Sequence, residues 1–318
     1  MSAPPTGRRP VDRPAAWTAL LNPAAGRGRA RTRLPRVADA LGAIDVDVEI
    51  VVTASAADLA TRAADAFARG RGVVACGGDG TVCTLAGLAA EAHGVLAIVA
   101  SGSGNDFARH LGIPDDIPAA VGLLPAGPGA GEMITVDLGR VTTADGATAW
   151  FTTVANTGFD AAANRWANTV TSVSGTPLYV AAALRTLGTY QPRGFRVVVD
   201  GEAHELAAWL VAVGNTRTYA SGMAITPDAS VRDGALDVCV VGAVSRWEFL
   251  ATFPKVFSGG HVTHPQVHTW RGHEVVVECA DEPMDLWASG ERLGPLPATI
   301  TPVAGALRVV VPRGATVI

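Results

Sequence analysis

The feature that most constrains this chain is a glycine-rich turn between an apolar run and a segment with helical spacing. The run Gly72–Cys76 is interpreted as a buried strand, Gly77-Gly78-Asp79-Gly80 follows at once, and Thr81–Ala92 is predicted to be a helix. Glycine suits positions where the backbone turns with positive φ or comes close to a ligand. A helix N-terminus directs N–H groups and the positive end of its dipole at one point, which favours an anion such as phosphate. An ordinary tight strand–helix turn with an acidic tip is the competing interpretation.

The rest of the first half alternates in the same way. Segments with strand character are followed by segments with the 3.6-residue apolar spacing of helices. The strands are expected at Trp17–Leu21, Val46–Val52 and Val95–Ala100, and the helices at Arg29–Leu41, Ala56–Ala68 and Asn105–Leu111. Alternation of this kind predicts an α/β domain with a doubly wound, parallel sheet and helices on both faces.

After about Asp137 the pattern changes to strands separated by Gly, Pro and Asp turns, which predicts a mainly antiparallel β-sandwich domain. Helices are expected only at Ala161–Ala167 and Leu178–Leu187. The predicted strands are Ala149–Ala155, Phe195–Val199, Leu206–Val213, Ala235–Val241 and Glu274–Cys279. The expected boundaries are a disordered tail over 1–15, the α/β domain over 16–145, the β-sandwich domain over 146–298 and a C-terminal segment over 299–318, whose return to the first domain is an open alternative.

Lysine is almost absent. Lys255 is the only lysine among the 25 lysine and arginine residues. A P-loop NTPase needs a Gly-Lys-Ser/Thr sequence, and a protein kinase needs a strand lysine on the nucleotide phosphates, so both classes are excluded. Any nucleotide bound here would be held by backbone N–H groups, helix dipoles and arginine.

Composition also indicates the cellular compartment and the kind of partner. The formal net charge is −4 and the pI is near 6.0, which argues against a nucleic-acid partner. No apolar run reaches the roughly 18 residues of a membrane-spanning helix, and Met1–Ala16 lacks the apolar stretch of a signal peptide. The four cysteines have no paired spacing, so reduced thiols are expected. These features predict a cytoplasmic protein.

Two further loops are expected beside the first. Ser101–Arg109 places small residues and Asn-Asp before a helix, and Asn22–Gly28 follows the first strand. Loops at the carboxyl ends of neighbouring parallel strands face one crevice. Capping of the short helix by Ser103 or Asn105 would explain the second loop without a ligand.

Taken together, these motifs resemble the bacterial diacylglycerol kinase and lipid kinase family, which is related to sphingosine kinases and shares its first glycine-rich motif with NAD kinases. The motifs cover nearly the whole chain after residue 16. They are Asn22-Pro23 with Gly26, Gly77–Thr81, Gly104–Arg109, Asn156–Asp160, Gly214–Gly222 with Pro227, Asp233–Val238, His261–Pro265 and Gly290–Pro297.

The resemblance implies ATP and Mg²⁺ bound by particular residues. The residues expected to bind nucleotide are Asn22, Thr53, Gly77, Gly78, Asp79, Gly80, Thr81, Val82, Cys83, Ser103, Asn105 and Asp106. The carboxylates implied for Mg²⁺ and the phosphates are Asp79, Asp106 and Asp137. A structural Mg²⁺ site is implied at Asp233 with the backbone carbonyls of Ser230 and Ala235.

The resemblance also implies catalytic residues. Glu291 stands where the family has the proton acceptor for the lipid hydroxyl, and Asp79 belongs to the same machinery. Phosphoryl transfer needs such an acceptor, and a carboxylate in a partly desolvated cleft can serve. The chain departs from the family at Ser289, where the usual sequence is Asp-Gly-Glu. Either Glu291 suffices alone, or activity is reduced or lost.

The expected function is ATP- and Mg²⁺-dependent phosphorylation of a lipid hydroxyl, with diacylglycerol converted to phosphatidic acid. The expected partner is lipid at the membrane surface, reached by peripheral association, and a homodimer is a candidate assembly. Two alternatives stay open. One is a small-molecule kinase of the NAD-kinase type, and the other is a lipid- or nucleotide-binding protein that has lost turnover.

One aromatic segment bears on the membrane question. Phe249, Phe253 and Phe257 have i, i+4, i+8 spacing beside Trp247, and Pro254 should break or kink the helix that they would form. The segment is expected to be mainly core, with membrane contact as the alternative if it is exposed.

Overall fold

The computed structural model describes residues 13–25, 30–125, 129–169 and 185–317. The helices are α1 (Ala30–Gly42), α2 (Ala56–Ala68), α3 (Asp79–Glu91), α4 (Asp106–His110), α5 (Ile117–Val121), α6 (Phe159–Thr169), α8 (Arg246–Thr252), and the 3₁₀ helices η2 (Phe253–Ser258) and η3 (Gly260–Thr263). The strands are β1 (Ala16–Leu21), β2 (Asp47–Val52), β3 (Gly72–Gly77), β4 (Val95–Ala100), β5 (Glu132–Thr143), β6 (Thr148–Phe151), β7 (Val154–Gly158), β8 (Arg193–Val199), β9 (Glu202–Gly214), β10 (Leu236–Gly242), β11 (Val267–Gly272), β12 (Val275–Cys279), β13 (Asp285–Ala288), β14 (Glu291–Pro295) and β15 (Ala298–Val311).

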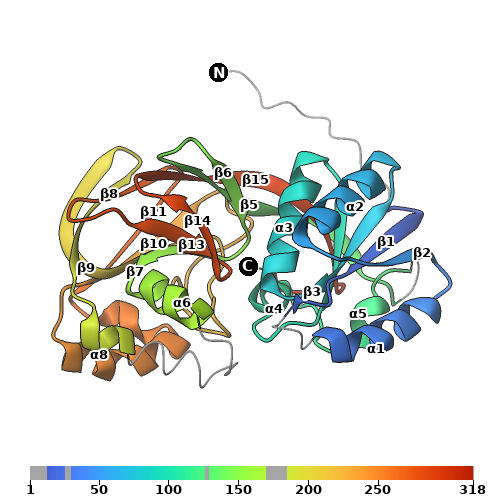
Figure 1. Cartoon of the computed structure of the whole chain (residues 1–318), viewed down its shortest axis with the longest axis horizontal. Helices are drawn as coiled ribbons and strands as arrows, with labels where there is room; N and C mark the ends of the chain where they lie inside the picture. Colours follow the sequence, from blue (N-terminus) through green and yellow to red (C-terminus); the bar gives the residue numbers. More distant parts are fainter. Residues whose placement is uncertain (1–12, 26–29, 126–128, 170–184, 318) are drawn as a thin grey trace.

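The first domain is the predicted parallel α/β unit. Its strands lie in the order β4-β3-β1-β2, and every pairing among them is parallel. Helices α2 and α3 cover one face of the sheet, and α1 and α5 cover the other (Figure 1). Trp17 and Phe107 are among the largest side chains in the core that this arrangement buries. The doubly wound fold predicted from the alternation is confirmed.

Local signals explain where these helices start. Ser55 caps α2 by accepting a hydrogen bond from the N–H of Asp58 at 3.1 Å, and Asp58 in turn accepts from the N–H of Ala54 at 2.9 Å. This reciprocal arrangement satisfies N–H groups that a helix N-terminus leaves without intrahelical partners. Helix α3 starts at Asp79, two residues before the predicted start at Thr81, so Asp79 and Gly80 of the glycine-rich turn belong to its first turn.

The second domain is the predicted antiparallel β unit. Strands β7, β8, β9, β10, β12 and β13 pair antiparallel around a separate core. Phe159, Phe195 and Trp209 are its largest fully buried side chains besides Phe151. Helices α6 and α8 lie on one side of this domain (Figure 1).

The last strand belongs to both domains. Near its start, β15 pairs antiparallel with β12, with Ile300 opposite Val275. Near its end, it pairs parallel with β4, with Arg308 opposite Val95. Because one continuous strand carries hydrogen bonds on both sides of the junction, the two sheets are joined into one.

The single strand predicted at Ala149–Ala155 is divided in the structure into β6 and β7. The reason is Asn215, which donates from its side chain to the carbonyl of Thr152 at 2.9 Å and from its backbone to the carbonyl of Thr153 at 2.8 Å, so these groups do not join a ladder.

Parts of two predicted segments lie outside the described residues. Most of the predicted helix Leu178–Leu187 is one of them. Residues 1–12 of the predicted disordered tail are the other, whereas Arg13 donates hydrogen bonds to the carbonyl of Gly131 at 2.8 Å and to that of Leu124 at 3.1 Å.

Among the residues that the structure describes, no helix combines the length and apolar character needed to cross a membrane.

Candidate functional site

The two glycine-rich loops touch each other. A β-carbon at position 102 would lie 2.6 Å from the Cα of Gly78, so the loops approach backbone to backbone. A β-carbon at position 104 would lie 2.6 Å from Oδ2 of Asp79 and 3.1 Å from Oδ2 of Asp106. Only glycine permits these distances, and the predicted convergence of the two loops is therefore observed.

Asp79 links the loops. Its carboxylate accepts hydrogen bonds from the N–H groups of Asn105 and Asp106, each at 2.8 Å. It thereby takes the capping role at the start of α4 that Ser103 or Asn105 could have had. Asn105 instead adopts φ 55° and turns its side-chain oxygen back to the N–H of Gly102 at 3.0 Å, while Ser103 is exposed at the loop tip.

The third loop joins the same place. Asn22 donates its side-chain N–H to Oγ1 of Thr81 at 2.9 Å, and its backbone N–H bonds to the carbonyl of Cys76. Thr53 is buried and donates its hydroxyl to the carbonyl of Leu21 at 3.2 Å. Gly26 lies outside the described residues.

Two of the residues expected to bind nucleotide have side chains that point away from the glycine-rich loops. Val82 is buried in the core of the first domain. Cys83 turns toward the second domain, where its thiol donates to the carbonyl of Trp150 at 3.4 Å. At these two positions, nucleotide contact would come from the backbone at the start of α3.

A pair of carboxylates borders this loop cluster. Burial raises the pKa of the Asp79 carboxyl, and the neighbouring charge of Asp106 adds to the increase, while the N–H groups that bond to Asp79 oppose it. Asp106 is 3% exposed and accepts from Arg109 at 3.1 Å. Carboxylate oxygens are the ligands that Mg²⁺ prefers, but in this arrangement all four oxygens of the pair already accept hydrogen bonds, from Asn105, Asp106, Arg109 and Ser221.

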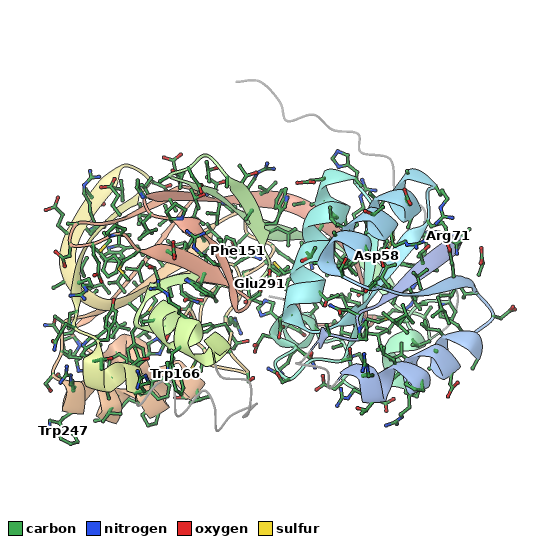
Figure 2. All side chains as sticks on the ribbon, viewed as in Figure 1. Asp58, Arg71, Phe151, Trp166, Trp247 and Glu291 are labelled. Atoms are coloured by element: carbon green, nitrogen blue, oxygen red, sulfur yellow. The ribbon has the colours of Figure 1, made fainter. Side chains whose placement is uncertain are left out.

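The second domain places Glu291 over the first loop. A β-carbon at position 80 would lie 3.2 Å from Oε1 of Glu291, so this carboxylate stands at the first turn of α3. It comes from the β13–β14 hairpin, whose turn residues Ser289 and Gly290 have φ of 51° and 79°. Figure 2 shows Glu291 where the two domains meet.

A cleft opens beside Glu291. It lies between α3 and the β13–β14 hairpin and is open to solvent. Cys83, Trp150, Ser289 and Glu291 are among its lining residues. Its walls therefore come from both domains, with Cys83 to Glu91 of α3 on one side and Glu291 on the other.

A second, mainly apolar cavity lies in the second domain and is partly open to solvent. Its polar lining residues include Asp160, which accepts a hydrogen bond from the hydroxyl of Tyr219. Burial raises the pKa of Asp160 to about 6, against the hydrogen bond from Tyr219. Burial, followed by the charge of Asp160, holds the pKa of the Tyr219 hydroxyl well above its usual value.

The residues implied for a structural Mg²⁺ do form one turn, but they do not fit a cation as arranged. Asp233 pairs with the guanidinium of Arg271 and accepts from the N–H of Ala235 at 3.0 Å. The guanidinium therefore already neutralises Asp233. Ser230 accepts from the N–H of Arg232 at 3.3 Å. In the part of the chain that the structure describes, no three His, Cys, Asp or Glu side chains gather as metal ligands.

Asp137 serves this same turn rather than the loop cluster. Its carboxylate accepts from the N–H of Gly234 at 2.8 Å and from the N–H of Gly305 at 2.7 Å. It is 4% exposed. These bonds tie the Asp233 turn to β15, the strand that joins the domains.

One residue at the junction was not predicted from the sequence. Ser221 of the second domain donates its N–H to Oδ2 of Asp106 at 2.8 Å. Ala220, Ser221 and Gly222 all have positive φ, at 48°, 69° and 104°. The only signal in the sequence is Gly222, because Ala and Ser seldom adopt this conformation.

Comparison with known proteins agrees with this arrangement. Residues 16–141 match the diacylglycerol kinase catalytic domain, and residues 153–311 match the YegS C-terminal NAD kinase beta sandwich-like domain. A diacylglycerol kinase of Mycobacterium tuberculosis is 38% identical over 298 residues, 93% of this chain and 95% of that protein. One from Bacillus subtilis is 25% identical, over 92% and 95%. The fold is shared with a diacylglycerol kinase structure from Bacillus anthracis at a TM-score of 0.69 and 21% identity, covering 96% of this chain and 100% of that one.

Proposed function

Because the chain belongs to the bacterial diacylglycerol kinase and lipid kinase family, we propose that it transfers the γ-phosphate of ATP to the hydroxyl of diacylglycerol and so produces phosphatidic acid. The observation that carries this proposal is the position of Glu291. Its carboxylate reaches from the second domain to the first turn of α3, where a β-carbon on Gly80 would lie 3.2 Å from Oε1.

The loop cluster supplies what the nucleotide phosphates need. The N–H groups in the first turn of α3 have no intrahelical partners, and the positive end of the helix dipole adds a favourable potential for an anion there. Backbone donors replace the lysine that other nucleotide-binding folds use, in keeping with a chain whose only lysine is Lys255. Asn22 and Thr81 fix the third loop against this turn.

Transfer then requires removal of one proton. The lipid hydroxyl oxygen attacks the γ-phosphorus, ADP leaves, and the Glu291 carboxylate accepts the hydroxyl proton. Glu291 lines the cleft between the two domains and also lies beside Gly80 of the glycine-rich loop, so an acceptor hydroxyl in the cleft could reach this carboxylate.

Asp79 and Asp106 would hold Mg²⁺ if the metal enters this site. When bound, Mg²⁺ supplies charge neutralisation for the phosphates. The carboxylates have a second role that does not depend on metal, since they fix the two loops and the second domain to one another.

The apolar cavity of the second domain is suited to hydrocarbon. Its lining includes Leu210, Ile225, Phe249 and Val256, and Asp160 and Tyr219 satisfy each other's polar groups. We assign it to part of the lipid tail and place the enzyme at the membrane surface. The predicted homodimer can be tested by measuring the mass of the protein in solution.

The test is transfer of labelled γ-phosphate to lipids in mixed micelles with Mg²⁺, using the full chain. Glu291→Gln should lower kcat by about 10² to 10⁴, because the amide cannot accept the proton. Glu282→Gln is the matched control, since Glu282 is exposed and pairs with Arg193 at 2.9 Å, away from the candidate site. Its rate should stay within about twofold of the unmodified chain.

The acceptors distinguish the alternatives. Diacylglycerol, a sphingoid base and NAD are offered in parallel. Label on NAD alone would replace the proposal with a small-molecule kinase. ATP binding without label on any acceptor would show a binding protein that has lost turnover, with Ser289 as the first position to restore.

A further inference from the structure

Large apolar side chains are exposed mainly in one short segment. Among the described residues, the exposed ones are Ile50, Val52, Trp247, Leu250 and Phe257, so three of the five lie within α8 and η2. Trp247 is 82% exposed and Phe257 is 56% exposed. We call Trp247, Leu250 and Phe257 the α8–η2 face. The expectation that this aromatic segment is mainly core is therefore wrong for its outer side.

The local sequence dictates this exposure. Ser245 caps α8 by accepting from the N–H of Glu248 at 3.2 Å. In the helix that follows, Trp247 and Leu250 stand at i and i+3 on one side. As predicted, Pro254 marks the change in structure, because α8 ends at Thr252 and the chain continues as η2. Figure 2 shows Trp247 pointing away from the body of the protein.

The inner side of the same segment lines the apolar cavity. Phe249, Phe253 and Val256 contribute to its wall, whereas the α8–η2 face does not. Phe253 and Phe257 are in edge contact, with ring centroids 6.3 Å apart, so the wall and the outer face are continuous. The segment is therefore apolar on both sides. If its outer face met the hydrocarbon of a membrane, the segment would lie between that hydrocarbon and the cavity.

Cations outnumber carboxylates in this segment, by two to one. Arg246 and Lys255 are exposed in the same segment, and Lys255 is the only lysine of the chain. The one carboxylate of the segment, Glu248, is 3.1 Å from Nε2 of His264. Exposed Trp and Phe with flanking cations match the interface of a bilayer that contains anionic lipid, where aromatic rings lie at headgroup level and basic side chains meet lipid phosphates.

We propose that the α8–η2 face docks on the surface of an anionic lipid bilayer, with the inner wall of the segment toward the apolar cavity. The reason for reaching a bilayer rests on the proposed lipid kinase function. The docking itself is a property of the surface and is measured without turnover.

The test is sedimentation of the full chain with phosphatidylcholine vesicles, with and without phosphatidylglycerol. A Trp247→Ser, Phe257→Ser double variant should bind anionic vesicles at least about tenfold more weakly, because its apolar anchors are lost. The matched control is Ile50→Ser, Val52→Ser, which removes the exposed apolar pair of β2 and should bind within about twofold. Equal binding by all three proteins would overturn the proposal.

Charge and activity add two independent readouts. Arg246→Gln with Lys255→Gln should remove most of the preference for phosphatidylglycerol and leave the weaker binding to phosphatidylcholine. On vesicle-embedded diacylglycerol, the serine double variant at 247 and 257 should lose rate in proportion to its binding. On a short-chain diacylglycerol below its micelle concentration, it should retain the rate of the unmodified chain, and a loss there would show damage to the site instead.

Failure of docking and failure of the kinase are distinguishable. Vesicle binding without phosphorylation of any lipid leaves the docking proposal standing and removes the kinase. Phosphorylation of short-chain diacylglycerol without vesicle binding supports the kinase and removes the docking proposal. If light scattering shows a dimer that the serine double variant at 247 and 257 converts to monomer with vesicle binding unchanged, the face binds a second copy and the proposal fails.

Discussion

The backbone N–H of Ser221 bonds to the carboxylate of Asp106 at 2.8 Å, and this contact crosses from the second domain to the first. Asp106 is also joined to Asp79, because its own N–H donates to Asp79 at 2.8 Å. On the other side, Tyr219 is two residues from Ser221 and bonds to Asp160 in the apolar cavity. One short turn therefore connects the glycine-rich loops with the cavity of the second domain.

Asp106→Asn should weaken this connection. The buried carboxylate accepts from both Ser221 and Arg109, and an amide would present a donor to one of them. We expect a loss of about 1 to 3 kcal/mol in the free energy of unfolding and a raised KM for ATP, measured by urea denaturation and initial rates. Asp65→Asn, at an exposed carboxylate, should change stability by less than about 0.5 kcal/mol. Equal effects of the two changes would contradict the role of the contact.

Gly104→Ala should separate the two loops. The new methyl group would lie 2.6 Å from Oδ2 of Asp79, so the carboxylate or the backbone must move. We expect a cost of about 1 to 3 kcal/mol in unfolding free energy together with weaker ATP binding, measured by calorimetry. The control is Gly42→Ala at the end of α1, where a β-carbon meets no atom within 4 Å and stability should be unchanged or higher. Unimpaired ATP binding by Gly104→Ala would count against the loop cluster as the nucleotide site.

Asp160→Asn should change how stability depends on pH. The pKa of Asp160 is raised from 3.8 to about 6, so the folded state holds its proton more tightly than the unfolded state does. The unmodified chain therefore loses stability from this group as pH rises through about 4 to 6, by up to about 3 kcal/mol above that window. The Asn variant lacks this loss.

The measurement is the difference in unfolding free energy between the two proteins at pH 4.5 and pH 7. The Asn variant should gain about 2 kcal/mol on the unmodified chain over that interval. Asp237, whose pKa is also raised to about 6, is present in both proteins and cancels. A difference that does not vary with pH would contradict the raised pKa.

Ser289 can be tested by two substitutions that separate its roles. Ser289 and Gly290 are the two residues of a hairpin turn with positive φ at both positions, where Asn-Gly and Asp-Gly are favoured. Ser289→Asn and Ser289→Asp should therefore both stabilise the hairpin, by a few tenths to about 1 kcal/mol. If the turn is the whole role, both variants should alter kcat equally. If a carboxylate assists Glu291, only Ser289→Asp should raise kcat.

The pH profile gives a second readout for the same pair. The carboxylate added by Ser289→Asp titrates in the acid range, so the acid limb of the kcat profile should change in that variant alone if the carboxylate assists catalysis. An acid limb that stays in place in both variants would assign the family's aspartate to turn formation.

Much of the fold was predictable because its signals are local. The run Gly72–Cys76 and the helix after Gly80 follow from periodicity, and the cap at Ser55 follows from residue type. The break at Pro254 was predictable for the same reason, since proline removes a helical hydrogen bond. The break between β6 and β7 was not, because its cause is Asn215, more than 60 residues away in the chain.

The candidate site also has features set by the local sequence and features set by contacts between distant residues. The amino-acid sequence by itself determined the glycine-rich turns, the missing phosphate-binding lysine and the residue types of the family, because these depend on neighbours along the chain. Only the tertiary structure decided that Asp79 caps α4, that Asp137 serves the Asp233 turn, and that Glu291 reaches Gly80. Those contacts join residues far apart in sequence, and their partners are fixed by how two separately cored domains pack around one shared strand.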